Sequence, residues 1–120
     1  MAEHNRLGKE GELLAVDYLK KKEYSILEIN WSEKKYEIDI IAKHNNQLIF
    51  VEVKTRNTDF FGNPVDAVTP IKQNHLIEGA NYYIEKYEID LECRFDVIGV
   101  VLNKTNFSLN HIIDAFYPEG

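Results

Sequence analysis

The sequence predicts an α/β fold, a mixed central sheet flanked by helices with the element order αβββαββ. Apolar residues recur at helical spacing near the N-terminus and again after Thr69-Pro70. Five short runs rich in β-branched residues show the composition of strands instead. Because the second helix interrupts these runs, it is long enough to connect a parallel pair of strands, so the sheet should be mixed.

The first half of the chain supplies one helix and three strands. Leu7, Leu14, Ala15, Tyr18 and Leu19 form one apolar stripe of a helix expected from Arg6 to Lys22. A strand is expected from Tyr24 to Trp31. Two further strands, Tyr36 to Lys43 and Gln47 to Lys54, should form a hairpin, because Asn45-Asn46 tolerates the positive φ that tight hairpin turns require.

The second half begins with a loop of turn-forming residues. Thr69 is the expected N-cap and Pro70 the first residue of a second helix, which should end near Tyr87. Two strands, Arg94 to Leu102 and Ser108 to Phe116, are expected to complete the sheet.

Length and composition predict one compact domain over residues 1–120, since 44% of the 120 residues are apolar. The net charge of -6 argues against a simple basic polyanion-binding protein. The acidity is concentrated in residues 73–120, which carry -5, whereas residues 1–72 carry only -1. A locally positive face is therefore compatible with the first 72 residues, whose cations include Lys20 to Lys22, Lys34, Lys35, Lys54, Arg56 and Lys72.

Cellular location is predicted from two simple features. Cys93 is the only cysteine, so the chain cannot form an internal disulfide. The sequence begins without the apolar run of a signal peptide, and nowhere approaches the ~20 apolar residues of a membrane span. We expect a cytoplasmic protein with no membrane partner.

The predicted hairpin concentrates charge on one face. A two-residue turn at Asn45-Asn46 would place Asp39 opposite Glu52, and Glu37 opposite Lys54. The other face is apolar and comprises Ile38, Ile40, Ala42, Ile49, Val51 and Val53. Like charges directly opposed on a sheet destabilise it.

Two interpretations of this hairpin stay open. In the first, the two carboxylates bind Mg²⁺ or Mn²⁺ with Lys54 beside an attacking water, which is the chemistry of phosphodiester hydrolysis. Alternatively, the four charges form a solvated ladder of ion pairs, which contributes little to stability.

Several motifs, in order along nearly the whole chain, resemble the YraN family. They are Gly8, Gly11-Glu12, Ala15, Tyr18-Leu19, Asn30-Trp31, residues 36–42, residues 50–56, Phe61-Gly62, Ala67-Val68, Lys72 and residues 94–97. Two positions depart from the family pattern: Tyr36 replaces a usual glycine, and Ser32 a common arginine. That family resembles Holliday-junction resolvases and other restriction-endonuclease-like nucleases.

The resemblance implies a restriction-endonuclease-like fold with the nuclease core written PD-(D/E)xK. It implies Asp39 and Glu52 as ligands of Mg²⁺ or Mn²⁺, the Val53 carbonyl as a third ligand, and Lys54 as the catalytic lysine. Glu12 would be an added glutamate from the first helix. The substrate implied is DNA, with branched or single-stranded structures as candidates, and the enzyme would act as a monomer or a homodimer.

Other residues have a functional and a structural interpretation. Lys72 and Gln73 fall in the first turn of the second helix, where the helix dipole favours a phosphate. Arg56 either contacts the nucleic-acid backbone or is simply solvated. Glu12 either faces the sheet or is an exposed helix acid. Phe60 and Phe61 either stack on bases or anchor their loop to the core.

Three functions follow from these observations. The first is a metal-dependent nuclease acting through Asp39, Glu52 and Lys54. The second is a non-catalytic nucleic-acid-binding protein of the same fold. The third is an interaction domain in which the charges form a solvated ladder.

Overall fold

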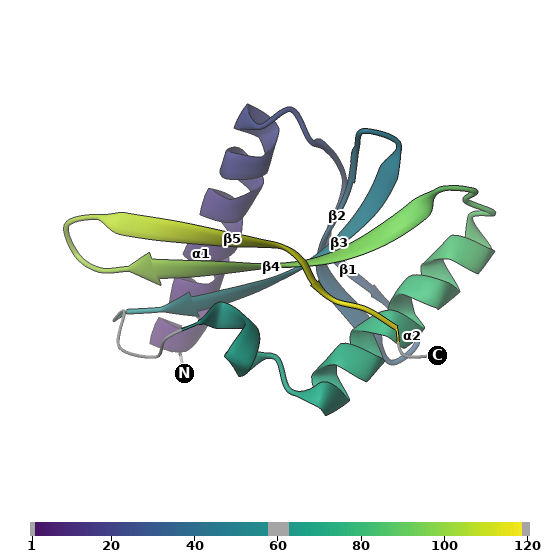
Figure 1. Cartoon of the computed structure of the whole chain (residues 1–120). Helices are drawn as coiled ribbons and strands as arrows, with labels where there is room; N and C mark the ends of the chain where they lie inside the picture. The colour runs from purple at the N-terminus through teal and green to yellow at the C-terminus, as the bar shows by residue number, and fades with distance from the viewer. Residues whose placement is uncertain (1, 58–62, 119–120) are drawn as a thin grey trace.

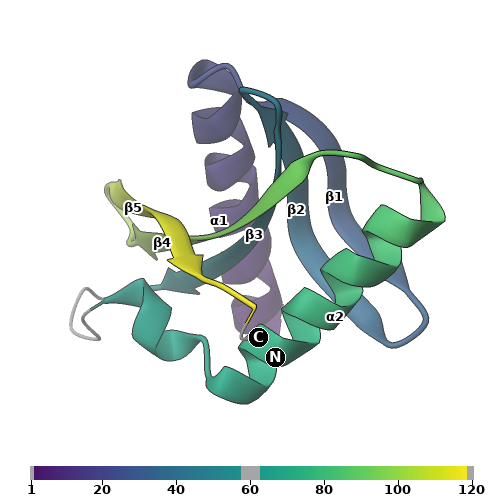
Figure 2. The same cartoon turned by 45° about the vertical axis from the view of Figure 1, so that its right-hand side comes forward.

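The computed structural model describes residues 2–57 and 63–118, and within them a five-stranded sheet lies between two helices. The first helix packs on one face of the sheet and the second on the other, which gives three layers (Figure 1). A view turned by 45° shows the same sandwich from the side of the second helix (Figure 2).

The expected element order is confirmed, with one short addition. The elements are α1 (Ala2–Lys21), β1 (Ser25–Glu33), β2 (Tyr36–His44), β3 (Gln47–Arg56), the 3₁₀ helix η1 (Pro64–Ala67), α2 (Pro70–Lys86), β4 (Glu92–Leu102) and β5 (Phe107–Phe116). Thr69 caps α2 as predicted, since its Oγ1 accepts a hydrogen bond from the Lys72 amide at 3.2 Å. No helix in the described ranges is long and apolar enough to cross a membrane.

The sheet is mixed, as its interrupted order predicted. The strands follow one another in space as β1-β2-β3-β4-β5. Only β3 and β4 are parallel, and the chain between them crosses over through η1 and α2. The other neighbours are antiparallel. This topology places β3 at the centre of the sheet, with α1 on one side and α2 on the other.

The two faces of the sheet each carry a hydrophobic core. The α2 core contains Trp31, Ile38, Ile41, Leu48, Phe50, Val68, Leu76, Ala80, Tyr83, Phe95, Val97 and Phe116. The α1 core contains Ala15, Val16, Leu19, Tyr24, Ile40, Ala42, Ile49, Val51, Ile98 and Val100.

Strand β2 breaks its alternation at Asp39, and this corrects the predicted face assignment. Ile38 lies in the α2 core and Ile40 in the α1 core, whereas residues two apart on a regular strand share a face. Asn30, between the β1 residues that pair with Ile38 and Ile40, has a φ of 54°. We attribute the change of face to this local distortion, which lies next to the charged residue.

Helix α1 approaches the sheet most closely at Gly11. A Cβ atom placed there would lie 1.9 Å from Thr55 Oγ1, so only glycine fits this contact with β3. Gly8, one turn earlier, has open space around it. The Gly11 contact therefore fixes how Glu12, the next residue, is presented to the end of β3.

Candidate active site

The register of the acidic hairpin is the predicted one. Asn45 and Asn46 both have positive φ, 49° and 64°, and β2 pairs with β3 from His44–Gln47 to Ile40–Val51. The pairing ends there, one residue short of Asp39 and Glu52. Beyond that point a side chain replaces the backbone as the acceptor: Asp39 Oδ2 accepts a hydrogen bond from the Val53 amide at 2.8 Å.

The expected pairing of Glu37 with Lys54 is wrong. Glu37 lies in the part of β2 that pairs only with β1, opposite Ser32, and it is exposed. Lys54 instead lies beside Glu52, with 3.6 Å between Nζ and Oε2. The reason is that the β2–β3 ladder ends at the Ile40–Val51 pair, so Glu37 has no partner on β3.

Glu52 is the buried centre of the site, with only 5% of its surface exposed. Two ammonium groups approach the same carboxylate oxygen. Lys54 Nζ lies 3.6 Å from Glu52 Oε2, and Lys72 Nζ from the first turn of α2 lies 3.8 Å from it. Lys72 was expected to contact a phosphate, and the structure places its ammonium group next to a carboxylate of the site.

The carboxyl groups of Asp39 and Glu52 shift each other's pKa, because the two residues lie just beyond the last pair of the β2–β3 ladder. Burial and the charge of Asp39 raise the pKa of Glu52 to about 7, although Lys72 and Lys54 oppose the shift. Burial also raises the pKa of Asp39, despite the Val53 amide and the two lysines. The raised pKa values mean that keeping both carboxyl groups charged is unfavourable, and a bound cation would relieve this cost.

Glu12 joins the pair from the α1 side of the sheet. Its Oε1 is buried and has no hydrogen-bond partner within the described part of the chain. Burial, and after it the charge of Asp39, raises the pKa of Glu12 to about 7, and hydrogen bonding by the Asn30 side chain offsets part of this. Of the two interpretations left by the sequence, the structure shows a Glu12 that faces the sheet.

These oxygens fit a hard divalent cation. Val53 donates its amide to Asp39, and the N–H and C=O of one strand residue point to the same side, so the Val53 carbonyl faces the Asp39 side as well. Within residues 2–57 and 63–118, no three His, Cys, Asp or Glu side chains form a ready-made metal cluster. Mg²⁺ ordinarily takes one or two carboxylates and completes its shell with water and phosphate. Asp39 and Glu52 supply that minimum, with Glu12 nearby.

The remaining candidates lie at the margin of the site. Gln73 turns its side-chain amide back to the Val68 carbonyl at 3.0 Å, which anchors the start of α2. Arg56, at the end of β3, donates to the Thr55 carbonyl at 3.1 Å. Phe60 and Phe61 lie outside the described residues.

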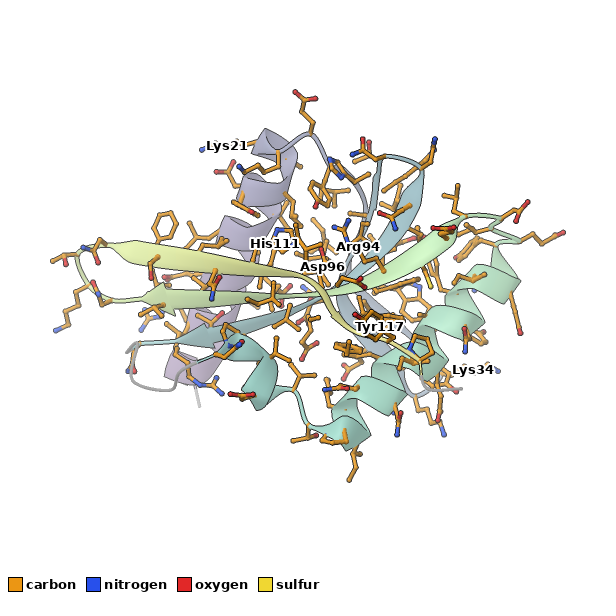
Figure 3. All side chains as sticks on the ribbon, in the orientation of Figure 1. Lys21, Lys34, Arg94, Asp96, His111 and Tyr117 are labelled. Carbon is orange, nitrogen blue, oxygen red and sulfur yellow. The ribbon has the colours of Figure 1, made fainter. Side chains whose placement is uncertain are left out.

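A second buried carboxylate, Asp96 on β4, was not singled out from the sequence as a charged group with a role of its own. It is fully buried, and Arg94 binds it through Nε and Nη2, both at 2.8 Å (Figure 3). His111 Nε2 lies 2.7 Å from the same carboxylate, and the Asp114 amide donates to it at 3.0 Å. Burial alone would raise the pKa of Asp96, but these hydrogen bonds lower it.

The Asp96 network joins several elements. Tyr18 of α1 lies 3.0 Å from His111 Nδ1, and Arg94 donates to Tyr24 and to Gln47. Histidine spacing gave no signal for His111, because its partners come from other elements. The Arg94-Phe95-Asp96 alternation was the available signal, since it places two opposite charges on one face of a strand otherwise rich in apolar residues.

Known proteins resemble this chain along most of its length. A family model described as "Uncharacterised protein family UPF0102" matches residues 11–100. A UPF0102 protein of Christiangramia forsetii is 54% identical over 117 residues, with 98% of both chains covered. Relatives from Flavobacterium psychrophilum and Phocaeicola vulgatus are 52% and 51% identical, again with 98% of each chain covered. These names state no activity.

Proposed function

Because the chain belongs to the uncharacterised protein family UPF0102, a membership that by itself assigns no activity, we propose its function from the candidate site: a divalent-metal-dependent nuclease that hydrolyses phosphodiester bonds in DNA. The resemblance to the YraN family predicted from the motifs is confirmed at the level of the family. The nuclease superfamily and the DNA substrate are part of the proposal.

One observation supports the proposal above all others, namely that a buried carboxylate oxygen of Glu12 has no hydrogen-bond partner in the described chain. It lies near Asp39, whose charge helps to raise the pKa of Glu12, and burial raises the pKa of Asp39 and of Glu52 as well. Buried polar atoms are ordinarily satisfied by a partner. A carboxylate oxygen without a donor, beside two further acids, is suited to a hard cation.

The proposed roles follow from the position of each residue. Asp39, Glu52 and the Val53 carbonyl would hold Mg²⁺ or Mn²⁺, with Glu12 as a further carboxylate beside them. When bound, the ion supplies Lewis-acid polarisation of a phosphodiester oxygen. Lys54 orients the water that attacks phosphorus and stabilises the charge that develops as the P–O bond breaks. Lys72 would contact a neighbouring phosphate.

The arrangement of elements is compatible with a restriction-endonuclease-like fold. The proposed ligands come from a hairpin of a mixed sheet, and the sheet continues across a parallel neighbour into β4. An additional acid comes from the helix that precedes the sheet. We include this fold family in the proposal on the strength of that arrangement and of the motif resemblance.

A second candidate is a nucleic-acid-binding protein of the same fold that does not cleave. The observation that favours it is the double contact of Lys54 and Lys72 with one oxygen of Glu52. Two ammonium groups already neutralise part of the acid cluster without any ion. The two candidates differ in whether the site binds a divalent cation.

The decisive experiment is cleavage of a DNA panel by the purified protein. Duplex, single-stranded, flap and four-way DNA are incubated with Mg²⁺, with Mn²⁺ or with EDTA. The nuclease predicts cleavage of at least one substrate that requires the metal and disappears in Asp39→Asn. Glu37→Gln is the matched control, since it removes an exposed carboxylate two residues away on the same strand.

The panel also separates the two candidates. DNA binding that persists in EDTA, together with no cleavage under any metal, would support the non-catalytic protein. Absence of metal binding by calorimetry, with and without DNA, would remove the nuclease proposal. If neither DNA binding nor cleavage is detected, both candidates fail.

A further inference from the structure

A strip of apolar, aromatic and basic side chains leads away from the candidate active site along α2 and the turn between β1 and β2. We call it the α2 strip and define it as Ile71, His75, Tyr36, Lys35 and Lys34. Both cartoon views place the β1–β2 turn beside the middle of α2 (Figures 1 and 2). Lys34 lies next to this helix (Figure 3). The candidate functions described above do not use this surface.

The centre of the strip is held in a fixed geometry. The rings of Tyr36 and His75 lie 5.4 Å apart between centroids, and His75 Nε2 lies 2.9 Å from the Lys35 carbonyl oxygen. Gly79 makes room for Tyr36, because a Cβ there would lie 3.1 Å from Tyr36 Cβ. Both rings stay half-buried, so each is supported from behind and keeps part of its surface open.

Both ends of the strip suit a nucleic-acid strand. Ile71 is 83% exposed, and no other exposed large hydrophobic of the described chain reaches that fraction. It lies four residues before His75 on α2, so the two side chains share a helix face. Lys35 places its Nζ 5.8 Å from the Tyr36 ring, and Lys34 is exposed beside it. Apolar and aromatic surface at one end of the strip thus adjoins two cations at the other.

The strip is continuous with the acid cluster through both of its elements. Tyr36 precedes Asp39 by three residues on β2, and Lys72 precedes His75 by three residues on α2. A strand whose phosphate lies between Lys54 and Lys72 would therefore run onto Ile71 and the two rings. Glu37 and Glu78 border the strip, and Glu78 accepts the Tyr36 hydroxyl at 3.5 Å. The two lysines of the strip, Lys34 and Lys35, equal these acids in number, and Lys72 adds a cation that contacts Glu52.

We propose that the α2 strip binds the single-stranded segment of a DNA substrate next to the scissile phosphate. Bases stack on Tyr36 and His75 and are covered by Ile71. Phosphates pair with Lys34 and Lys35. Stacking on aromatic rings between cations is how proteins hold unpaired strands without reading their sequence. This proposal rests on the proposed nuclease function, because only a nuclease has a scissile phosphate. It deepens that function by adding a preference for substrates with an unpaired strand over blunt duplex.

The test measures binding of a fluorescein-labelled oligodeoxythymidine of roughly 15 nucleotides by anisotropy in EDTA. The double variant Lys35→Ser/Ile71→Ser should raise its Kd about tenfold, since both side chains are exposed and their loss should leave the fold intact. Tyr36→Leu keeps an apolar contact with α2 and should weaken binding by a similar factor. Binding of a blunt duplex should change less than about twofold in each variant.

A matched control uses Lys20→Ser/Ile113→Ser, which removes an exposed lysine from α1 and a 56% exposed isoleucine from β5. Its Kd for the oligonucleotide should stay at the wild-type value. The proposed role of the strip is overturned if the control and strip variants weaken oligonucleotide binding equally, or if the strip variants do not weaken it.

The cleavage panel separates failure of the strip from failure of the nuclease. If metal-dependent cleavage requires Asp39 but the strip variants cut flap and duplex DNA in the wild-type ratio, the strip is wrong and the nuclease stands. If no DNA is cut but the oligonucleotide binds through the strip, the nuclease is wrong and the strip stands. A wild-type protein that does not bind the oligonucleotide overturns the strip in either case.

Discussion

Two groups of carboxylates lie inside the molecule, and their surroundings shift the pKa in opposite directions. Asp96 receives donors from Arg94, His111 and the Asp114 amide, and its pKa lies below the ordinary value. Asp39 accepts the Val53 amide and Glu52 lies beside two lysines, yet burial raises the pKa of both carboxyl groups. The charged form of a carboxyl group is thus favoured at Asp96 and disfavoured at Asp39 and Glu52.

The difference separates a structural role from a chemical one. Satisfied buried charges hold elements together, and the Asp96 network does so for α1, the β2–β3 hairpin, β4 and β5. Unsatisfied buried acids cost stability unless something else binds them. We therefore expect substitutions at the two places to affect different properties of the protein.

The largest effect is expected for activity in Asp39→Asn. The amide can still accept the Val53 hydrogen bond, so the fold should be retained, while a charged ligand is lost. Metal-dependent cleavage should fall at least about a thousandfold. Thermal unfolding, recorded on the same sample, should show no loss of stability. A folded variant with wild-type cleavage would contradict the catalytic role.

The converse result is expected for Asp96→Asn. Removing one partner from a buried ion pair costs about 3–5 kcal/mol, because the other charge is left uncompensated. Urea unfolding should detect this as a lower midpoint. At a temperature where the variant stays folded, cleavage per folded molecule should remain near that of the wild type. Selective loss of cleavage without destabilisation would mean that the two regions are not functionally distinct.

A pH series sharpens the comparison through Glu52. Its ordinary pKa of 4.5 in the unfolded chain is raised to about 7 in the fold, so between these values the folded state holds a proton that the unfolded state has released. Metal-free wild-type protein should therefore lose stability as pH rises from about 4.5 to 7. Glu52→Gln should lose on the order of 2 kcal/mol less over that window.

The control for this series is Glu37→Gln, whose carboxylate is exposed on the same strand as Asp39, and it should follow the wild-type curve. Mn²⁺ added above pH 7 should restore stability to the wild type and much less to Glu52→Gln. Identical pH dependence of stability in Glu52→Gln and the wild type would show that burial does not raise the pKa of Glu52.

The smallest effect is expected at the contact that presents Glu12. Gly11→Ala would place a methyl group on Thr55, and such overpacking costs about 1–3 kcal/mol. Gly8→Ala is its matched control, since open space surrounds Gly8 and alanine there should stabilise the helix by up to about 1 kcal/mol. Thr55→Gly should rescue Gly11→Ala. Thermal unfolding and cleavage together report whether displacement of α1 affects the site.

Local patterns predicted most of the fold. Strand alternation, the Asn45-Asn46 turn and the Thr69 cap are local signals, and each is found in the structure. The hairpin register placed Asp39 near Glu52 because a two-residue turn leaves little freedom. The change of face at Ile38 was not predictable in this way, since it depends on the conformation of Asn30 on the neighbouring strand.

The parts of the site that were missed depend on contacts between distant elements. The closeness of Gly11 to Thr55 and the assembly of the Asp96 network follow from how α1 and β5 dock on the sheet. No spacing rule within one element contains that information. Lys72 was predicted in the first turn of α2 because a helix start is a local signal, but its contact with Glu52 is tertiary and was not predicted.

The tight turn at Asn45-Asn46 also governs the order in which the chain can assemble. A hairpin closes a short loop, whereas the β3–β4 pair must wait for η1 and α2 to traverse residues 57–91. Asp39 and Glu52 are therefore brought together by local closure before Lys72 arrives with the crossover. Until then Lys54, two residues along the same strand, is a cation within the hairpin that can offset the repulsion between the two acids.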